Sequence, residues 1–141
     1  MPLPPARFFG GQYLNGGIAL PIVLADAGSA TLPLRDACSG FNTLNLLVTI
    51  TNIVAGNTFK VILETIDPET GAAIPSALGS VTMISQTTNN SFAASLYLPA
   101  YYTGLTGLIL PFYVNDLKLT NTGGNAGNMN VTALKVWLSN A

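Results

Sequence analysis

Residues that could carry catalytic chemistry are few in this chain of 141 residues. It has no histidine, which is the commonest general base in enzymes and the commonest protein ligand for metals. The single cysteine, Cys38, has no histidine to activate it as a nucleophile, so we expect it to act as a small hydrophobic residue. The sequence therefore predicts neither nucleophilic catalysis nor a disulfide framework.

Paired carboxylates are the remaining candidates for acid–base chemistry. Glu64 and Glu69 have the residue types of a glycosidase pair. Glu69, however, lies within residues 67–71 (DPETG), where the proline and the glycine are typical of a turn. We therefore expect a charged turn and no enzyme. We also expect no cofactor and no metal; any calcium ligands would come from Asp67 with Glu69, or Asp26 with Asp36.

The remaining motifs and the charge balance exclude further classes of ligand. Residues 122–127 (TGGNAG) are rich in glycine, but no Lys-Ser/Thr pair and no helical pattern follows, so they are not a phosphate loop. The net charge is −1 with five cations, which provides no electrostatic surface for nucleic acid. No apolar run reaches the length of a membrane-spanning helix, and we expect no membrane partner.

The elements that position these residues are predicted to be strands. Within residues 43–51, Leu44, Leu46, Val48 and Ile50 alternate with residues that are mostly polar, which indicates a strand with one buried face. Residues 59–66 alternate in the same way, but both faces are partly apolar. Apolar side chains such as Leu47 and Ile62 are therefore left over from a single core.

Four more strands are expected, at residues 78–86, 91–98, 110–120 and 129–139. We expect a hairpin-like link at 87–90, a bulge near Asn115 and Asp116, and a loose loop at 121–128. In the last strand, strict alternation would place Asn130, Thr132, Leu134, Val136 and Leu138 on one face. About six to eight short strands in one domain predict an all-β fold, an antiparallel β-sandwich of jelly-roll-like topology.

The first residues differ from the rest. Residues 1–17 combine three prolines with aromatic residues and glycines, which predicts an extended arm ahead of a β-sandwich domain at 18–141. We expect the arm to dock on a neighbouring subunit or on the capsid of a virus particle; the alternative is an arm folded back along its own domain. The residues expected to make this contact are Pro4, Pro5, Phe8, Phe9 and Tyr13.

The low charge predicts assembly. Only 8% of residues are charged, and charged residues are depleted at the centres of interfaces. The segment 99–110 lies between strands yet is rich in tyrosine and leucine, so it either forms an interface or caps the open end of the core. We expect a permanent homo-oligomer, a trimer or another ring. Its contacts in this segment would be Tyr101, Tyr102, Leu105 and Leu108.

The strand sequences resemble those of a known family type. Residues 44–51 (LNLLVTIT), 59–64 (FKVILE) and 131–138 (VTALKVWL) are similar to strands of head decoration, or cement, proteins of tailed bacteriophages. The resemblance lies in composition and strand cadence over residues 41–139. It implies a trimeric jelly-roll protein that sits on the capsid surface of the virion, contacts the major capsid protein and stabilises the head.

Two other functions remain open. One is another virion component, such as a tail, head-fibre or minor capsid protein. The other is a carbohydrate-binding or adhesin module, in which Tyr101, Tyr102 and Trp137 would stack on sugar rings. Because the first residues lack the pattern of a signal peptide, we expect synthesis in the host cytoplasm without export.

Overall fold

The computed structural model describes residues 7–10, 19–35, 41–67, 69–74, 80–98 and 115–140. No helix among these residues is long and apolar enough to cross a membrane. The described segments form nine strands. They are β1 (Arg7–Gly10), β2 (Ile22–Leu24), β3 (Ser29–Arg35), β4 (Thr43–Thr51), β5 (Thr58–Thr65), β6 (Ser80–Gln86), β7 (Asn90–Tyr97), β8 (Asn115–Thr122) and β9 (Met129–Ser139).

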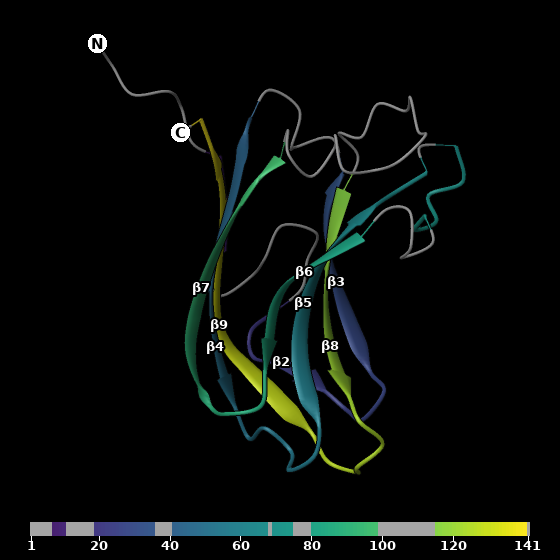
Figure 1. The fold of residues 1–141 in the computed structure, drawn as a ribbon, viewed down its shortest axis with the longest axis vertical. Coiled ribbons are helices and arrows are strands. Elements are labelled where there is room, and N and C mark those ends of the chain that lie inside the picture. The colour runs from purple at the N-terminus through teal and green to yellow at the C-terminus, as the bar shows by residue number, and fades with distance from the viewer. Residues whose placement is uncertain are drawn as a thin grey trace.

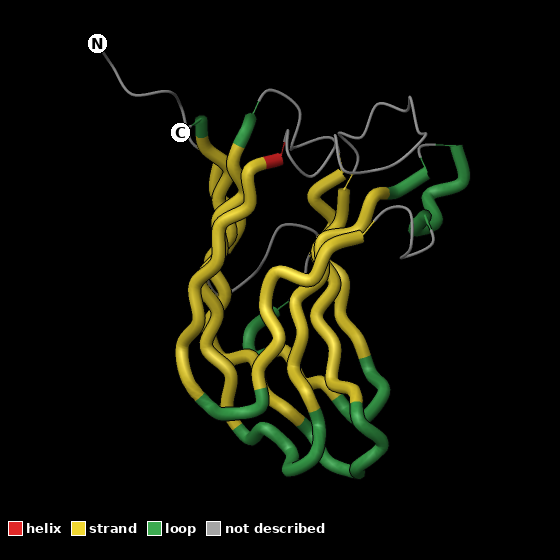
Figure 2. Tube along the Cα trace, viewed as in Figure 1, coloured by secondary structure: helices red, strands yellow, loops and turns green. Residues whose placement is uncertain are grey.

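The strands form two antiparallel sheets that face each other (Figure 1). One sheet has five strands, in the order β1-β9-β4-β7, and β2 pairs with β9 as well. The other has four strands, in the order β3-β8-β5-β6. The fold is therefore the all-β sandwich that the alternation of the sequence predicts. Strand and loop segments are distinguished in Figure 2, where described turns lie at both ends of the sandwich.

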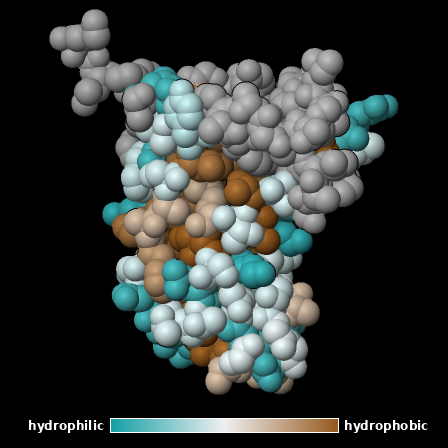
Figure 3. Space-filling model, viewed as in Figure 1, coloured by the Kyte–Doolittle hydropathy of each residue, from teal (hydrophilic) through white to brown (hydrophobic). Residues whose placement is uncertain are grey.

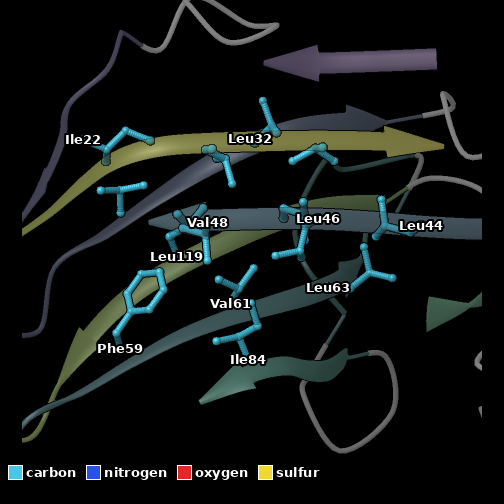
Figure 4. Close-up of a cluster of buried hydrophobic side chains, with 14 of the residues drawn as sticks. Ile22, Leu32, Leu44, Leu46, Val48, Phe59, Val61, Leu63, Ile84 and Leu119 are labelled. Atoms are coloured by element: carbon cyan, nitrogen blue, oxygen red, sulfur yellow. The ribbon is translucent and has the colours of Figure 1, made fainter. Parts of the chain in front are cut away.

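The core lies between the sheets and is built from the alternate residues of the central strands (Figure 4). On β4 the predicted apolar face is confirmed, with Leu44, Leu46, Val48 and Ile50 buried. Phe59, Val61 and Leu63 of β5 meet them from the other sheet. Every second residue of a strand points to the same face, so the intervening residues form the outer faces.

A bulge changes which side chains of β9 face the core, and a second bulge lies close to a predicted one. In β9 the register shifts opposite Thr49 and Ile50, so Thr132 and Ala133 are both exposed, while Val131 and Leu134 are buried. The prediction that Asn130 and Thr132 share the face of Leu134 is therefore wrong, because a bulge reverses the alternation. The bulge expected near Asn115 and Asp116 has its register shift on the partner strand β3, between Pro33 and Arg35.

The link at 87–90 does not join a hairpin. β6 pairs with β5, and β7 pairs with β4, so the link crosses from the edge of one sheet to the edge of the other. A short polar segment between two alternating strands has the same sequence pattern in both arrangements. By contrast, the turn expected at 67–71 is confirmed by a hydrogen bond from the Gly71 N–H to the Asp67 carbonyl, with Gly71 at φ 74°.

Two buried asparagines connect the loops at one end of the sandwich. Asn57 Nδ2 donates to Asn121 Oδ1 at 2.9 Å, and Asn121 Nδ2 donates to the carbonyls of Leu24 at 3.0 Å and Gly127 at 3.2 Å. Both side chains are at most 1% exposed. Asp26 Oδ1 accepts a hydrogen bond from the Gly124 N–H at 3.1 Å. These contacts fix the β2–β3, β4–β5 and β8–β9 connections to one another.

Part of the N-terminal arm belongs to the five-stranded sheet. Arg7–Gly10 form β1, which pairs with residues 135–138 of β9 in the same chain. β2 pairs with residues 129–131 of β9, so both short strands lie along one edge of β9. These four residues therefore follow the folded-back alternative, while docking of the arm on a neighbour stays a prediction. The rest of the arm lies outside the described residues.

Candidate functional site

The outer face of the five-stranded sheet is the candidate site. The register of β7, β4 and β9 places Tyr97, Thr43 and Ser139 in one row across the sheet. The next row contains Ser95, Asn45 and Trp137, and the third contains Ala93, Leu47 and Lys135. We call these three rows the platform. Its side chains point away from the core because they alternate with the buried residues of the same strands.

Hydrogen bonds organise the polar part of the platform. Asn45 Oδ1 accepts a hydrogen bond from Ser95 Oγ at 2.8 Å, and Asn45 Nδ2 donates to Ser139 Oγ at 3.0 Å. The Asn45 amide thus bridges β7 and β9 across β4. Each hydroxyl retains capacity for a ligand, because Ser139 still has its own O–H donor and Ser95 still has a free lone pair. Ser139 and Ser95, on either side of Asn45, therefore offer a donor and an acceptor at fixed positions.

Two aromatic residues lie next to these polar side chains. Tyr97 is 55% exposed, and Trp137 is half-buried. They are two strands and two residues apart, so their Cα atoms lie about 12 Å from each other, given about 4.8 Å between strands and 3.4 Å per residue. Leu47 lies in the central strand beside them and is 37% exposed. The platform thus combines uncharged polar side chains and one lysine with apolar ones, and its two aromatic groups are separated by about the length of one disaccharide.

The two outer faces differ in charge. Among the described platform residues, Lys135 is the single formal charge. The outer face of the other sheet alternates charges of both signs: Glu64 lies opposite Asp116, and Lys118 is in register with Ile62. Asp116 is buried, and Glu64 and Lys118 are half-buried. A face with few charges is typical of one that binds another molecule.

The two residues of the glycosidase-like pair, Glu64 and Glu69, lie on different elements. Glu64 lies on β5, in register with Asp116 of β8, whereas Glu69 lies in the exposed turn that follows. Asp26 belongs to the asparagine cluster, where it accepts from Asn57 Nδ2 at 3.3 Å. Within the described part of the chain, no group of three or more Cys, Asp or Glu side chains is placed to hold a metal ion.

Trp137 is the predicted sugar-stacking residue that the structure describes, and it lies in the platform. For Phe8 and Phe9 the structure describes the backbone in β1, where they are in register with Trp137 and Val136. The other predicted contacts lie outside the described residues, as do Cys38, Asp36 and the segment 99–114. They are Pro4, Pro5, Tyr13, Tyr101, Tyr102, Leu105 and Leu108.

Sequence reasoning missed the other members of the platform. Tyr97 lies in the strand predicted at 91–98, and alternation alone would have placed it with Ser95 on the face away from Leu96. The position of Asn45 between Ser95 and Trp137 depends on the pairing of β4 with β7 and β9. These strands are far apart in the sequence, and no local pattern specifies their order.

The chain matches no family model and no curated protein sequence. Solved structures show its fold. The CBM22-1 xylan-binding domain of Paenibacillus barcinonensis Xyn10C is similar with a TM-score of 0.55 and 11% identity, over 96% of this chain and 83% of that one. The CBM22-1–GH10 modules of Clostridium thermocellum endo-1,4-beta-D-xylanase 10B, complexed with xylohexaose, are similar with a TM-score of 0.50 and 12% identity. The match covers 93% of this chain but 24% of the xylanase chain.

A viral protein is matched more weakly. The VP2 subviral particle of infectious bursal disease virus gives a TM-score of 0.44 at 11% identity, over 97% of this chain and 33% of that one. This value is too low to support an argument about the fold. The chain thus has the β-sandwich fold of carbohydrate-binding modules, and its resemblance to phage decoration proteins stays a prediction.

Proposed function

We propose that this chain is a carbohydrate-binding module that binds a polysaccharide across the platform. The observation that carries the proposal is the row of Ser95, Asn45 and Trp137, with Tyr97 in the adjacent row. A pyranose ring presents apolar C–H groups on its faces and hydroxyl groups around its edge. Trp137 and Tyr97 match the faces, and the uncharged polar row matches the edge.

The geometry favours an extended ligand over a single sugar. A row of side chains that crosses three strands can contact several sugars of one chain without a pocket that closes around the ligand. The separation of about 12 Å between Tyr97 and Trp137 allows two sugars of one chain to stack at the same time. Stacking at two positions raises affinity through effective concentration. The fold that the chain shares with a xylan-binding domain supports a polymer of this class.

The proposal is tested with single substitutions and affinity electrophoresis in gels that contain soluble xylan. Trp137→Ala and Tyr97→Ala should each weaken binding about tenfold, which corresponds to about 1.4 kcal/mol of lost stacking and contact. Ile62→Ala is the matched control, because Ile62 is half-buried on the outer face of the other sheet. It should leave binding unchanged. Retardation of the wild type that neither aromatic substitution reduces would refute the proposed site.

A second candidate is the structural virion protein, a trimer of this chain that contacts the major capsid protein. The observation that favours it is an apolar seam between the edge strands β6 and β7. Its members are partly buried hydrophobic residues packed against the core: Val81, Met83, Phe92, Ala94 and Leu96. Apolar side chains gather on this side of the surface (Figure 3). An apolar seam at an open sandwich edge fits burial against another subunit.

Sedimentation velocity at micromolar concentration tests this second candidate. The wild type should sediment as a trimer, and Met83→Glu should dissociate it because a charge would be buried in the seam. Thr82→Glu, at the exposed neighbouring position, should have no effect. A wild type that sediments as a monomer would contradict assembly, and a monomer that binds xylan would favour the module.

A further inference from the structure

Lys135 is placed to select among polysaccharides. It lies on the platform in the third row, with Leu47 and Ala93 as its neighbours on β4 and β7. Its side chain is exposed. None of the described platform residues is acidic, so none of them neutralises the ammonium group.

Lys118, on the other sheet, has acidic neighbours. Lys118 lies two residues along β8 from Asp116, and Asp116 is in register with Glu64 of β5. Lys118 is half-buried and has two carboxylates near it on the same face of its sheet. Lys135 has no such compensation among the described residues of its face, so an anionic ligand would supply it.

The position of Lys135 relative to Trp137 defines which part of a sugar it would meet. The two residues are on the same face of β9 and two positions apart, so their Cα atoms are separated by about 7 Å. The lysine side chain is long and flexible, and its ammonium group reaches the border of the indole. A sugar stacked on Trp137 has its ring substituents around that border. The carboxylate of a uronic acid is such a substituent, because it projects outward from the edge of the ring.

We infer that the platform prefers polysaccharides that carry uronic acids, and that Lys135 binds the carboxylate of the sugar stacked on Trp137. This inference rests on the proposed function, since it uses the same face. The contact is an exposed ion pair. Pairs of this kind change binding by about two- to fivefold, and salt screens them.

The test compares one polymer in two forms, glucuronoxylan and the same glucuronoxylan after chemical reduction of its carboxyl groups. Binding is measured by affinity electrophoresis and calorimetry at low salt and again at 1 M NaCl. The wild type should bind the native polymer about two- to fivefold more tightly than the reduced polymer at low salt. This preference should disappear at high salt, where the Debye length is about 3 Å.

Substitutions locate the preference. Lys135→Gln should remove the preference for the native polymer, and Lys135→Glu should reverse it. Lys118→Gln, the matched control on the other sheet, should retain the preference. Equal binding of both polymers by the wild type would overturn the role of Lys135 and leave the proposed function intact. A preference that Lys118→Gln abolishes as well would also overturn it. Failure to bind either polymer would overturn both proposals.

Discussion

The buried amide of Asn121 is expected to contribute a large part of the stability of the domain. Its Nδ2 group donates to two loop carbonyls, of Leu24 and Gly127, and its Oδ1 accepts from Asn57. In Asn121→Ala, Asn57 Nδ2 keeps two other acceptors, Asp26 Oδ1 and the Asn125 carbonyl. The loss therefore falls mainly on the carbonyl of Leu24, whose bond is buried, and on the carbonyl of Gly127, whose bond is part-buried.

Two lost hydrogen bonds of about 1 kcal/mol each, with the cost of the desolvated Leu24 carbonyl and a small cavity, amount to about 2–4 kcal/mol. An unfolding entropy of about 2.1 cal/mol/K per residue makes 1 kcal/mol equivalent to about 3.4 °C in a chain of this length. The expected fall in Tm is therefore about 7–14 °C.

Thermal unfolding followed by circular dichroism measures this fall. Asn128→Ala is the control, because Asn128 lies in the β8–β9 connection that Asn121 contacts and its side chain is exposed. It should change the free energy of unfolding by less than about 0.5 kcal/mol. If Asn121→Ala unfolds at the same temperature as Asn128→Ala, the cluster does not hold the three connections together, and the reasoning is wrong.

Three further predictions concern the same fold. Gly123→Ala should lower the free energy of unfolding in urea by about 1–3 kcal/mol, because Gly123 has φ 146° and a Cβ there would lie 2.7 Å from the Gly56 carbonyl oxygen. Gly124→Ala, where a Cβ would meet open space, should lower it by less. Deletion of residues 1–10 should lower Tm and promote self-association in sedimentation, because it frees the edge of β9 that pairs with β1; an unchanged Tm would mean that β1 adds nothing. Neither EDTA nor a reducing agent should move Tm by more than about 2 °C, and a larger shift with EDTA would indicate a bound cation.

The sequence predicts the strands well where one face is buried against the other sheet. Alternation of Leu44, Leu46, Val48 and Ile50 specifies β4, since any slip by one residue would turn these side chains to solvent. The same reasoning fails in β9, where the bulge at Thr132 and Ala133 reverses the faces. A bulge adds one residue without a distinctive side chain, so a polar residue followed by alanine gives no local signal.

The platform could be predicted only in part. Alternation assigns Tyr97 and Trp137 to the outer faces of their own strands, but it does not bring them into one site. That requires β4 to lie between β7 and β9. Strand order depends on contacts between segments distant in the chain, and the polar link at 87–90 gives no sign that it crosses between sheets.

The central claim is that a polysaccharide lies across the outer face of β7, β4 and β9. It is tested most directly by titrating xylohexaose into the isotopically labelled protein and following backbone amide chemical shifts by NMR. The account predicts that the shifts concentrate around Asn45, Ser95 and Trp137, while the amides of β3, β5 and β8 stay unchanged. Shifts confined to those three strands, or no shifts at millimolar ligand, would contradict it.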